Sequence, residues 1–281
     1  MGGNRRRPHI KEMDSAGPIT PYERDQGEHI QSWSQEPPGI VERAAGVALA
    51  PLSWVFNRII PPSAIEALLR ASDWLADKTI GDAAKQGDAA AASPEASLEE
   101  LDAATDRIRN WAIAYASGEG AVAGAVGLIS LPIDIPAVVT LSLRTIRRIG
   151  LVYGYAAANE AEKKFIFSVL AVAGANSMPQ KISALDAMRD LETDLIAQHW
   201  VALGQRAAQR TVRAETMLMF IRDVAEQLGL NLSRRKALAA VPIVGAAIGA
   251  AMNGWYLRDV ATAAQRAYQE RWLRERGRLI G

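Results

Sequence analysis

The sequence predicts an all-α protein built as a single helical domain. Apolar residues recur at helical spacing in several segments, and no stretch of useful length alternates apolar and polar residues as a strand would. Nearly half of the 281 residues are apolar but only 6% are aromatic, so Ala and Gly supply much of the interior. Because small side chains let helices approach closely, we expect a thin, helical core.

The first 38 residues predict a disordered or loosely docked tail. They contain several prolines and scattered polar residues, and they show neither helical nor strand periodicity. The arginines at 5–7 are followed by polar sequence instead of an apolar run, so the pattern does not indicate a Sec signal peptide. We therefore expect a protein that is made and kept in the cytoplasm.

The helical domain is expected to span 39–281. An apolar pattern over 40–57 predicts its first helix, and Ser63 predicts the N-cap of a second helix over about 64–79. Residues 81–97 are small and polar, which is typical of a flexible internal linker.

Four further helical regions are expected after the linker. Ser97 predicts the N-cap of a helix that continues to Gly118, with two acids in its first turn. A helix over about 160–175 begins with charged residues and ends with apolar ones. Mixed-charge helices follow between 181 and 228, and an Arg-bearing amphipathic helix closes the chain.

Two segments, Glu119 to Arg144 and Lys236 to Arg258, are almost free of charge and rich in Gly and Ala. Each carries at least one proline, and we expect each to fold as a helical hairpin. Such segments are too apolar for a water-facing surface, so they form the buried centre of a helical domain or insert into a membrane. The sequence leaves both arrangements open.

Several short blocks stand out within the helical domain. They are Gly118-Glu119-Gly120 through Gly127-Leu128, Pro132-Ile133-Asp134-Ile135-Pro136, the helix over 160–173, and Val241-Pro242-Ile243-Val244-Gly245-Ala246 followed by Asn253. These blocks cover most of 45–275 and resemble the EcsC protein family. The resemblance implies a bacterial, mostly helical protein with an expected association with membranes. Because the family is defined by a protein encoded beside an ABC transporter, it also implies a transporter component as a candidate partner.

The chain carries no recognisable catalytic motif, since GxSxG, P-loop and Rossmann fingerprints are all absent from its sequence. The lack of Cys excludes disulfides and thiolate metal sites. His9 and His29 lie in the tail, and His199 has no acid at the spacing of three or four that one helix face requires. We therefore expect no metal and no cofactor, and the pattern favours a non-enzymatic protein without excluding an enzyme.

Glu119 and Asp134 are the acids of the first apolar segment and form the candidate acid/base pair. In the alternative interpretation Glu119 ends the preceding helix and Asp134 caps a helix that begins at Ile135-Pro136. Arg144 could reach Asp134 through a bend. Asp134, Arg144 and Asn253 would then line a cavity between the two hairpins, with room for an apolar ligand such as a lipid tail.

Arginines and aromatic residues near the apolar segments predict a surface for anionic membranes, because cations attract headgroups and Trp and Tyr favour the interface. The alternative is an ordinary amphipathic helix with a solvated Arg face. A net charge of +1 and interleaved acids argue against nucleic acid as a partner. The residues assigned to the membrane surface are Arg144, Arg147, Arg148, Trp255, Tyr256, Arg271, Trp272 and Arg274.

The preferred hypothesis is a non-enzymatic helical protein that associates peripherally or reversibly with the cytoplasmic membrane, with membrane lipids as partners. Its apolar hairpins would then enter the bilayer, as in a membrane-perturbing or effector-like protein. Two alternatives stay open: a soluble enzyme or lipid-binding domain with a cavity between the hairpins, and a scaffold for a transporter component.

Overall fold

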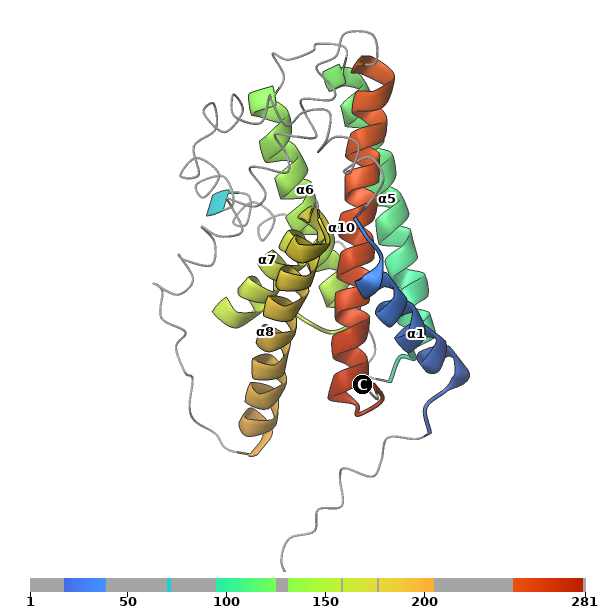
Figure 1. The fold of residues 1–281 in the computed structure, drawn as a ribbon, viewed down its shortest axis with the longest axis vertical. Coiled ribbons are helices and arrows are strands. Elements are labelled where there is room, and N and C mark those ends of the chain that lie inside the picture. Colours follow the sequence, from blue (N-terminus) through green and yellow to red (C-terminus); the bar gives the residue numbers. More distant parts are fainter. Residues whose placement is uncertain are drawn as a thin grey trace, which may run out of the picture.

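The computed structural model describes residues 18–38, 70–71, 95–124, 131–157, 159–175, 177–204 and 245–279 (Figure 1). All regular secondary structure in these residues is α-helical, which confirms the predicted fold class. The predicted helix over 40–57, most of the one over 64–79 and most of the 81–97 linker lie outside the described residues. The described helices are α1 (Pro21–Gln35), α5 (Leu98–Gly124), α6 (Leu131–Val152), α7 (Glu160–Gly174), α8 (Met178–Gly204) and α10 (Gly245–Glu275).

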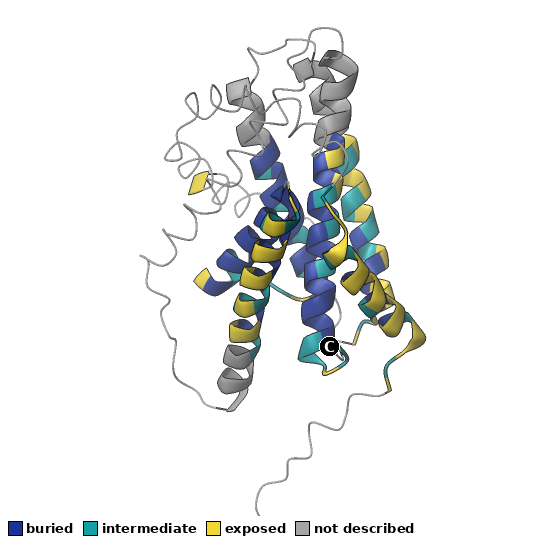
Figure 2. Ribbon diagram, in the orientation of Figure 1, coloured by how far each residue is buried: buried dark blue, intermediate teal, exposed yellow. Residues whose placement is uncertain are grey.

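Helix α10 lies in the middle of the bundle, with α5 running along it and α6 and α7 packed on other sides (Figure 1). Its buried residues include four alanines, Ala261, Ala263, Ala264 and Ala267, which let the neighbouring helices come close, and larger side chains follow them toward the end of the helix. Figure 2 shows that burial is nearly continuous along the described part of α10, whereas α1, α5 and α8 each keep an exposed side. The predicted thin helical core is present, and α10 is its centre.

Gly150 is the point of closest approach between α6 and α10. A Cβ atom there would lie 2.7 Å from the hydroxyl oxygen of Tyr268 and 3.2 Å from the backbone oxygen of Tyr155. The buried Tyr268 ring lies 6.2 Å from the ring of Tyr153, 5.6 Å from that of Tyr155 and 5.3 Å from that of Phe165. Only glycine leaves room for this aromatic cluster beneath α6.

The predicted tail over 1–38 contains an ordered helix, so that prediction is wrong for residues 21–35. Thr20 is the N-cap of α1 and forms a capping box with Glu23, and Pro21 occupies the first helical position. Ile30 is fully buried against the bundle. The helix is polar overall, and it packs on the core through the buried Ile30 and the partly buried Tyr22 and Trp33. Residues 1–17 lie outside the described part.

The first apolar hairpin is present as α5 and α6, which contact each other. Ser97 caps α5 as predicted: its hydroxyl accepts from the Glu100 backbone N–H at 3.3 Å, and its own N–H donates to the Glu100 carboxylate at 2.9 Å. The helix continues past the predicted end at Gly118, so Glu119 lies within it. For the second hairpin, the described residues begin at Gly245 and contain only α10.

Asp134 lies inside α6 and not at its N-cap. The helix begins at Leu131, so Asp134 is its fourth residue, and the interpretation that it caps a helix starting at Ile135 is wrong. Pro132 stands at the second helical position, where no backbone N–H is needed. The first of the two prolines therefore starts the helix, and the second lies within it.

The helix predicted over about 160–175 is confirmed as α7, whose N-cap Asn159 accepts from the Glu162 backbone N–H at 2.9 Å. Helix α8 follows after a short turn and packs mainly on α7. The remaining mixed-charge sequence up to 228 lies outside the described residues.

Candidate functional site

An exposed pair of aromatic rings marks the outer side of α5. Trp111 and Tyr115, one turn apart, stack with their ring centroids 5.3 Å apart, and they are 39% and 46% exposed. Arg144 and Arg148 of α6 place their guanidinium carbons 5.3 and 5.1 Å from the centre of the Trp111 ring. A cation over an aromatic face is attracted by the ring quadrupole. We call these four residues the aromatic–arginine patch.

The structure places half of the predicted membrane-surface residues inside the protein. Arg147 of α6 is buried. Tyr256, Arg271 and Trp272 are buried because α10 is the central helix of the bundle and not an outer amphipathic one. They do not form a surface in this fold. Arg144 and Arg148 are half-buried in the patch, and Trp255 is 48% exposed.

Arg271 shows why a buried arginine on α10 is tolerated. Its two terminal nitrogens donate to the two carboxylate oxygens of Glu162 at 2.8 Å each, and its Nε donates to Glu275 at 3.2 Å. The guanidinium carbon lies 3.9 Å from the centre of the Tyr155 ring. Burial acts to lower the pKa of Arg271, but the bonds to Glu162 outweigh it and raise the pKa above its usual range. Arg271 therefore ties α10 to α7 instead of meeting solvent.

The candidate acids and Asn253 come to one end of the bundle. The hydrogen bonds from Gln269 to Asp102 and from Arg109 to Gln265 set an antiparallel register between α5 and α10. Continued along both helices, this register brings Glu119 level with Asn253. The contacts between α5 and α6 likewise place Asp134 near the end of α5.

Arg144 does not belong to that group. It lies ten residues after Asp134 on the uninterrupted helix α6, which corresponds to about 15 Å along the helix axis. Its guanidinium group lies over Trp111. The predicted partnership of Asp134 and Arg144 through a bend is therefore wrong, because α6 continues through both residues without a break.

A buried carboxylate on α5, absent from the residues predicted from sequence, organises the other end of the bundle. Asp102 accepts hydrogen bonds from the hydroxyls of Tyr22, at 2.7 Å, and Tyr153, and from Nε2 of Gln269 at 2.7 Å. Burial, followed by the bond to Asp102, raises the pKa of Tyr22. Burial is also the main cause that raises the pKa of Tyr153. Both phenols therefore remain donors, and one carboxylate links α1, α5, α6 and α10.

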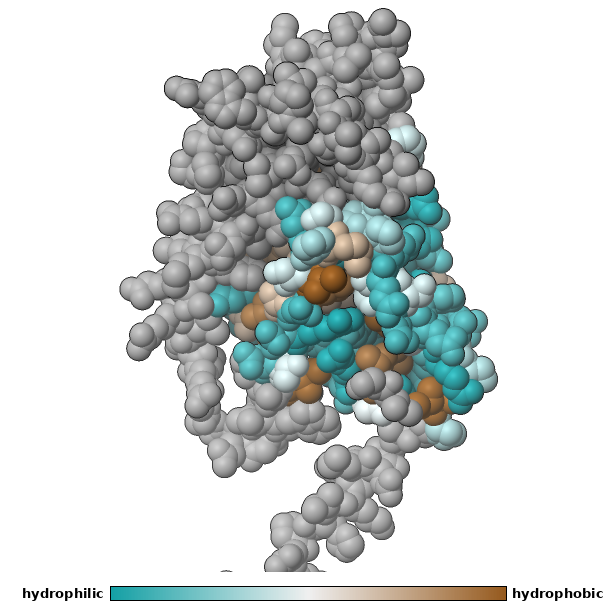
Figure 3. Space-filling model, in the orientation of Figure 1, coloured by the Kyte–Doolittle hydropathy of each residue, from teal (hydrophilic) through white to brown (hydrophobic). Residues whose placement is uncertain are grey.

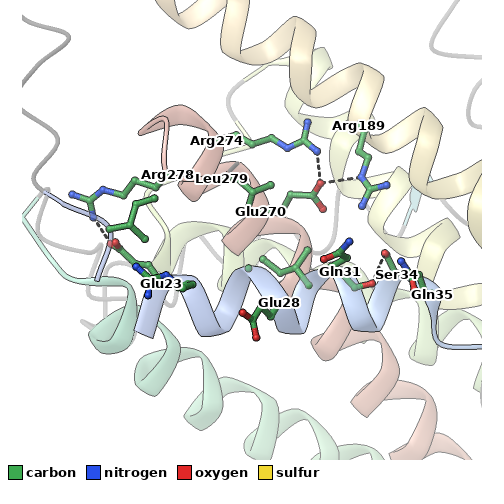
Figure 4. Close-up of a pocket in the computed structure, with 14 residues that line it drawn as sticks. Glu23, Glu28, Gln31, Ser34, Gln35, Arg189, Glu270, Arg274, Arg278 and Leu279 are labelled. Atoms are coloured by element: carbon green, nitrogen blue, oxygen red, sulfur yellow. Dashed lines mark hydrogen bonds and ion pairs between the residues drawn. The ribbon is translucent and has the colours of Figure 1, made fainter. Parts of the chain in front are cut away.

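A second charged cluster lies between α8 and α10. Arg189 Nε donates to Glu270 Oε1 at 2.9 Å, and Arg274 Nη2 donates to the same oxygen at 2.6 Å, as Figure 4 shows. The Arg274 Nε also lies 3.5 Å from Oε1 of Glu192. Glu192 and Glu270 are 0% and 1% exposed. We call these four residues the α8–α10 charge cluster.

The α8–α10 charge cluster opens on a groove of about 490 Å³ between α1, α8 and the end of α10. Half of its lining residues are charged, and Arg278 closes one end through an ion pair with Glu23 (Figure 4). On the face seen in Figure 3 the described residues are mostly polar, with hydrophobic side chains in small separate groups.

Asp102 and Glu192 each lie among buried apolar residues on one side of their helix. This pattern is the signal by which sequence periodicity could identify them. Leu185, Met188 and Leu195 are buried on the same side of α8 as Glu192. Leu98 and Leu101 are buried near Asp102 on α5. An acid within such a stripe must be paired or protonated.

Two classes of site find no candidate in the described part of the chain. Its residues contain no group of three or more His, Cys, Asp or Glu side chains that could hold a metal ion. None of its helices combines the length and the hydropathy that a membrane span requires.

Comparison with known proteins gives a family for most of the chain. The model of the EcsC protein family matches residues 24–273, which confirms the resemblance seen in the sequence blocks. The match begins inside α1. One similar protein, described as "Uncharacterized protein YdbA" from Bacillus subtilis (strain 168), is 27% identical over 161 residues, or 57% of this chain and 54% of that protein. The match thus spans about half the length of this relative. No solved structure matches the chain significantly.

Proposed function

This chain belongs to the EcsC protein family, and we propose that it is a non-enzymatic protein that associates peripherally with anionic membrane surfaces through the aromatic–arginine patch. The observation that carries the proposal is the exposed stack of Trp111 and Tyr115 beside the guanidinium groups of Arg144 and Arg148. Two separate helices contribute these groups, so the α5–α6 hairpin holds them in one place.

The chemistry of the patch suits the boundary between water and lipid. Trp and Tyr rings carry an apolar body and a polar edge, and they favour the headgroup region. An arginine close to an anionic bilayer contributes about 1 kcal/mol. Arg144 and Arg148 together would then strengthen binding by about 2 kcal/mol, a factor of about 30 in affinity. Binding of this size is reversible and weakens as salt screens the charges.

Trp255 extends the proposed contact toward the end of the bundle that carries Glu119 and Asn253. The hydrogen bond between Arg109 and Gln265 fixes the relative level of α5 and α10. Because α5 and α10 are antiparallel, Tyr115, which follows Arg109, and Trp255, which precedes Gln265, lie on the same side of this bond along the bundle axis. We expect Trp255, which is exposed on α10, to reach the bilayer after the patch has docked.

Vesicle flotation of the full chain tests the proposal. Vesicles of phosphatidylcholine alone and vesicles with 30% phosphatidylglycerol are compared at 50 and 500 mM salt. We expect flotation with the anionic vesicles at low salt and its loss at high salt. Flotation that resists high salt would point to insertion of the apolar segments instead, and absence of flotation with both vesicle types contradicts membrane association.

A further inference from the structure

The α8–α10 charge cluster holds more acceptor oxygens than donors reach. Among the described residues, no hydrogen bond reaches either oxygen of Glu192 or Oε2 of Glu270. Both Arg189 and Arg274 direct their bonds to the other oxygen of Glu270. A buried carboxylate oxygen without a donor is costly, and a proton on one carboxyl group removes much of that cost.

Glu192 is the carboxyl group of the pair that takes the proton more easily. Its burial, opposed by Arg274 and reinforced by the negative charge of Glu270, raises the pKa of Glu192 to about 8. By contrast, Oε1 of Glu270 accepts hydrogen bonds from two guanidinium groups, those of Arg189 and Arg274. One proton at Glu192 therefore leaves the cluster with a single negative charge between two arginines.

The position of the cluster gives this proton a mechanical consequence. Helix α8 packs mainly on α7, and its C-terminal half diverges from α10 in Figure 1. Near its start, Lys181 donates to the backbone oxygens of Trp33 at 2.6 Å and Glu36 at 2.8 Å, which holds this end against α1. Further along, the long side chains of the cluster bridge α8 to α10.

We propose that Glu192 is the proton-binding residue of a latch between α8 and α10. With Glu192 neutral, the two helices stay joined around Arg274. When Glu192 loses its proton, a carboxylate charge arises at a fully buried position. The loss of hydration there outweighs the attraction of Arg274, and α8 moves away from α10 until Glu192 is hydrated. The start of α8 stays fixed by Lys181, so the groove between α1, α8 and α10 widens.

Other charged groups lie near the latch, and their titration has to be distinguished from that of Glu192. They are Arg189 on α8, Glu270, Arg271 and Arg274 on α10, Glu162 and Lys164 on α7, and Glu23, Arg24 and Glu28 on α1. Carboxyl and guanidinium groups ordinarily titrate far from pH 8. Lys164 needs a control, because burial lowers its pKa. Substitution of Glu192 itself shows whether a pH-dependent change comes from Glu192 or from one of these groups.

The absence of cysteine allows a clean distance measurement. Ala103→Cys on α5 and Thr193→Cys on α8 are both exposed positions for nitroxide labels. Double electron–electron resonance between them is recorded from pH 6 to 9.5. We expect the distance to lengthen with a midpoint near pH 8, and Glu192→Gln to keep the short distance throughout. Asp186→Asn, a matched change at an exposed acid of the same helix, should leave the transition in place.

Glu270→Gln provides a second variant, because it removes the neighbouring negative charge. Its transition should have a midpoint at a lower pH than that of the unaltered chain, whether or not Glu192→Gln folds. A distance that stays constant from pH 6 to 9.5 overturns the proposal. So does a transition that survives unchanged in Glu192→Gln, or a midpoint that Glu270→Gln does not lower.

Discussion

Tyr22 of α1 donates its hydroxyl hydrogen to Asp102 of α5, 80 residues later in the chain, at 2.7 Å. This bond belongs to the cluster in which Tyr153 and Gln269 also donate to Asp102. A segment that composition alone classifies as a tail is thereby joined to the centre of the bundle. The docking of α1 rests on polar pairing, with Ile30 as its buried apolar contact.

Removing the carboxylate at 102 should release α1. Asp102→Ala leaves the donors on Tyr22, Tyr153 and Gln269 without their acceptor, and a buried unpaired donor costs about 1 to 3 kcal/mol. We expect the free energy of unfolding to fall by about 3 kcal/mol or more. Urea denaturation measures this loss.

Limited proteolysis within α1 separates local release from global unfolding. Tyr22→Phe removes one hydrogen bond and should cost about 1 kcal/mol while increasing cleavage within α1. Tyr115→Phe, at an exposed tyrosine of α5, serves as the control and should leave both readings unchanged. If Tyr22→Phe and Tyr115→Phe behave alike, Asp102 does not hold α1.

Two glycines provide a matched test of helix packing. Gly150→Ala would place a methyl group 2.7 Å from the Tyr268 hydroxyl oxygen, so α6 and α10 must move apart. We expect a loss of about 1 to 3 kcal/mol in stability. At Gly27 the same methyl group would lie 3.8 Å from Leu279, which is an ordinary contact, and the helix propensity of Ala should raise stability by up to about 1 kcal/mol. Thermal denaturation of both variants gives the comparison, and equal effects of the two contradict the close packing at Gly150.

Arg271→Lys distinguishes a buried arginine from one that faces a membrane. Lys cannot reproduce the paired bonds to Glu162 or the stacking on Tyr155. We expect a loss of about 2 kcal/mol or more in stability, with no direct effect on vesicle binding by the folded protein. The control is Arg107→Lys at an exposed position of α5. If the Arg271→Lys protein is stable but binds vesicles more weakly, Arg271 contacts the membrane and does not have the buried role described here.

The stability of the chain should depend on pH through Glu192. Its pKa is about 8 in the folded state against 4.5 in the unfolded state, so between these values the folded state binds the extra proton. The contribution is complete below pH 4.5 and is lost as pH rises toward 8, at a rate of about 1.4 kcal/mol per pH unit.

Glu192→Gln stays neutral and should not show this loss. The difference in unfolding free energy between Glu192→Gln and the unaltered chain should therefore change in favour of the variant from pH 5 to pH 9. Other titrating groups cancel in that difference. Urea denaturation across the range measures it, and a difference that does not vary with pH would mean that Glu192 ionises normally in the folded protein.

Periodicity and capping chemistry predicted much of the fold. Ser97 began α5 as expected, and the change from charged to apolar residues identified α7. The start of α6 was misplaced, because Pro132 and Pro136 both suit a helix start and the sequence alone does not rank them. Helix α1 was missed because the segment is polar overall, although Thr20, Pro21 and Glu23 form a local helix-start signal that sequence reasoning could have used.

The candidate site was predicted less completely than the fold. Arg144 and Arg148 of α6 are half-buried and Trp255 is exposed, whereas Arg147, Tyr256, Arg271 and Trp272 are buried. Sequence shows that a helix carries arginines but not whether other helices surround it. The role proposed for Trp111 and Tyr115 depends on α6, which brings Arg144 and Arg148 beside Trp111.

Flotation of a patch variant tests the central proposal most directly. Trp111→Ala combined with Tyr115→Ala removes both exposed rings, and Ile182→Ala removes an exposed apolar side chain from α8 as the matched control. On anionic vesicles at low salt, we predict that the double variant loses most of its binding while it stays folded by circular dichroism, and that Ile182→Ala binds as the unaltered chain does. Equal binding by all three proteins would contradict the assignment of the membrane contact to the aromatic–arginine patch.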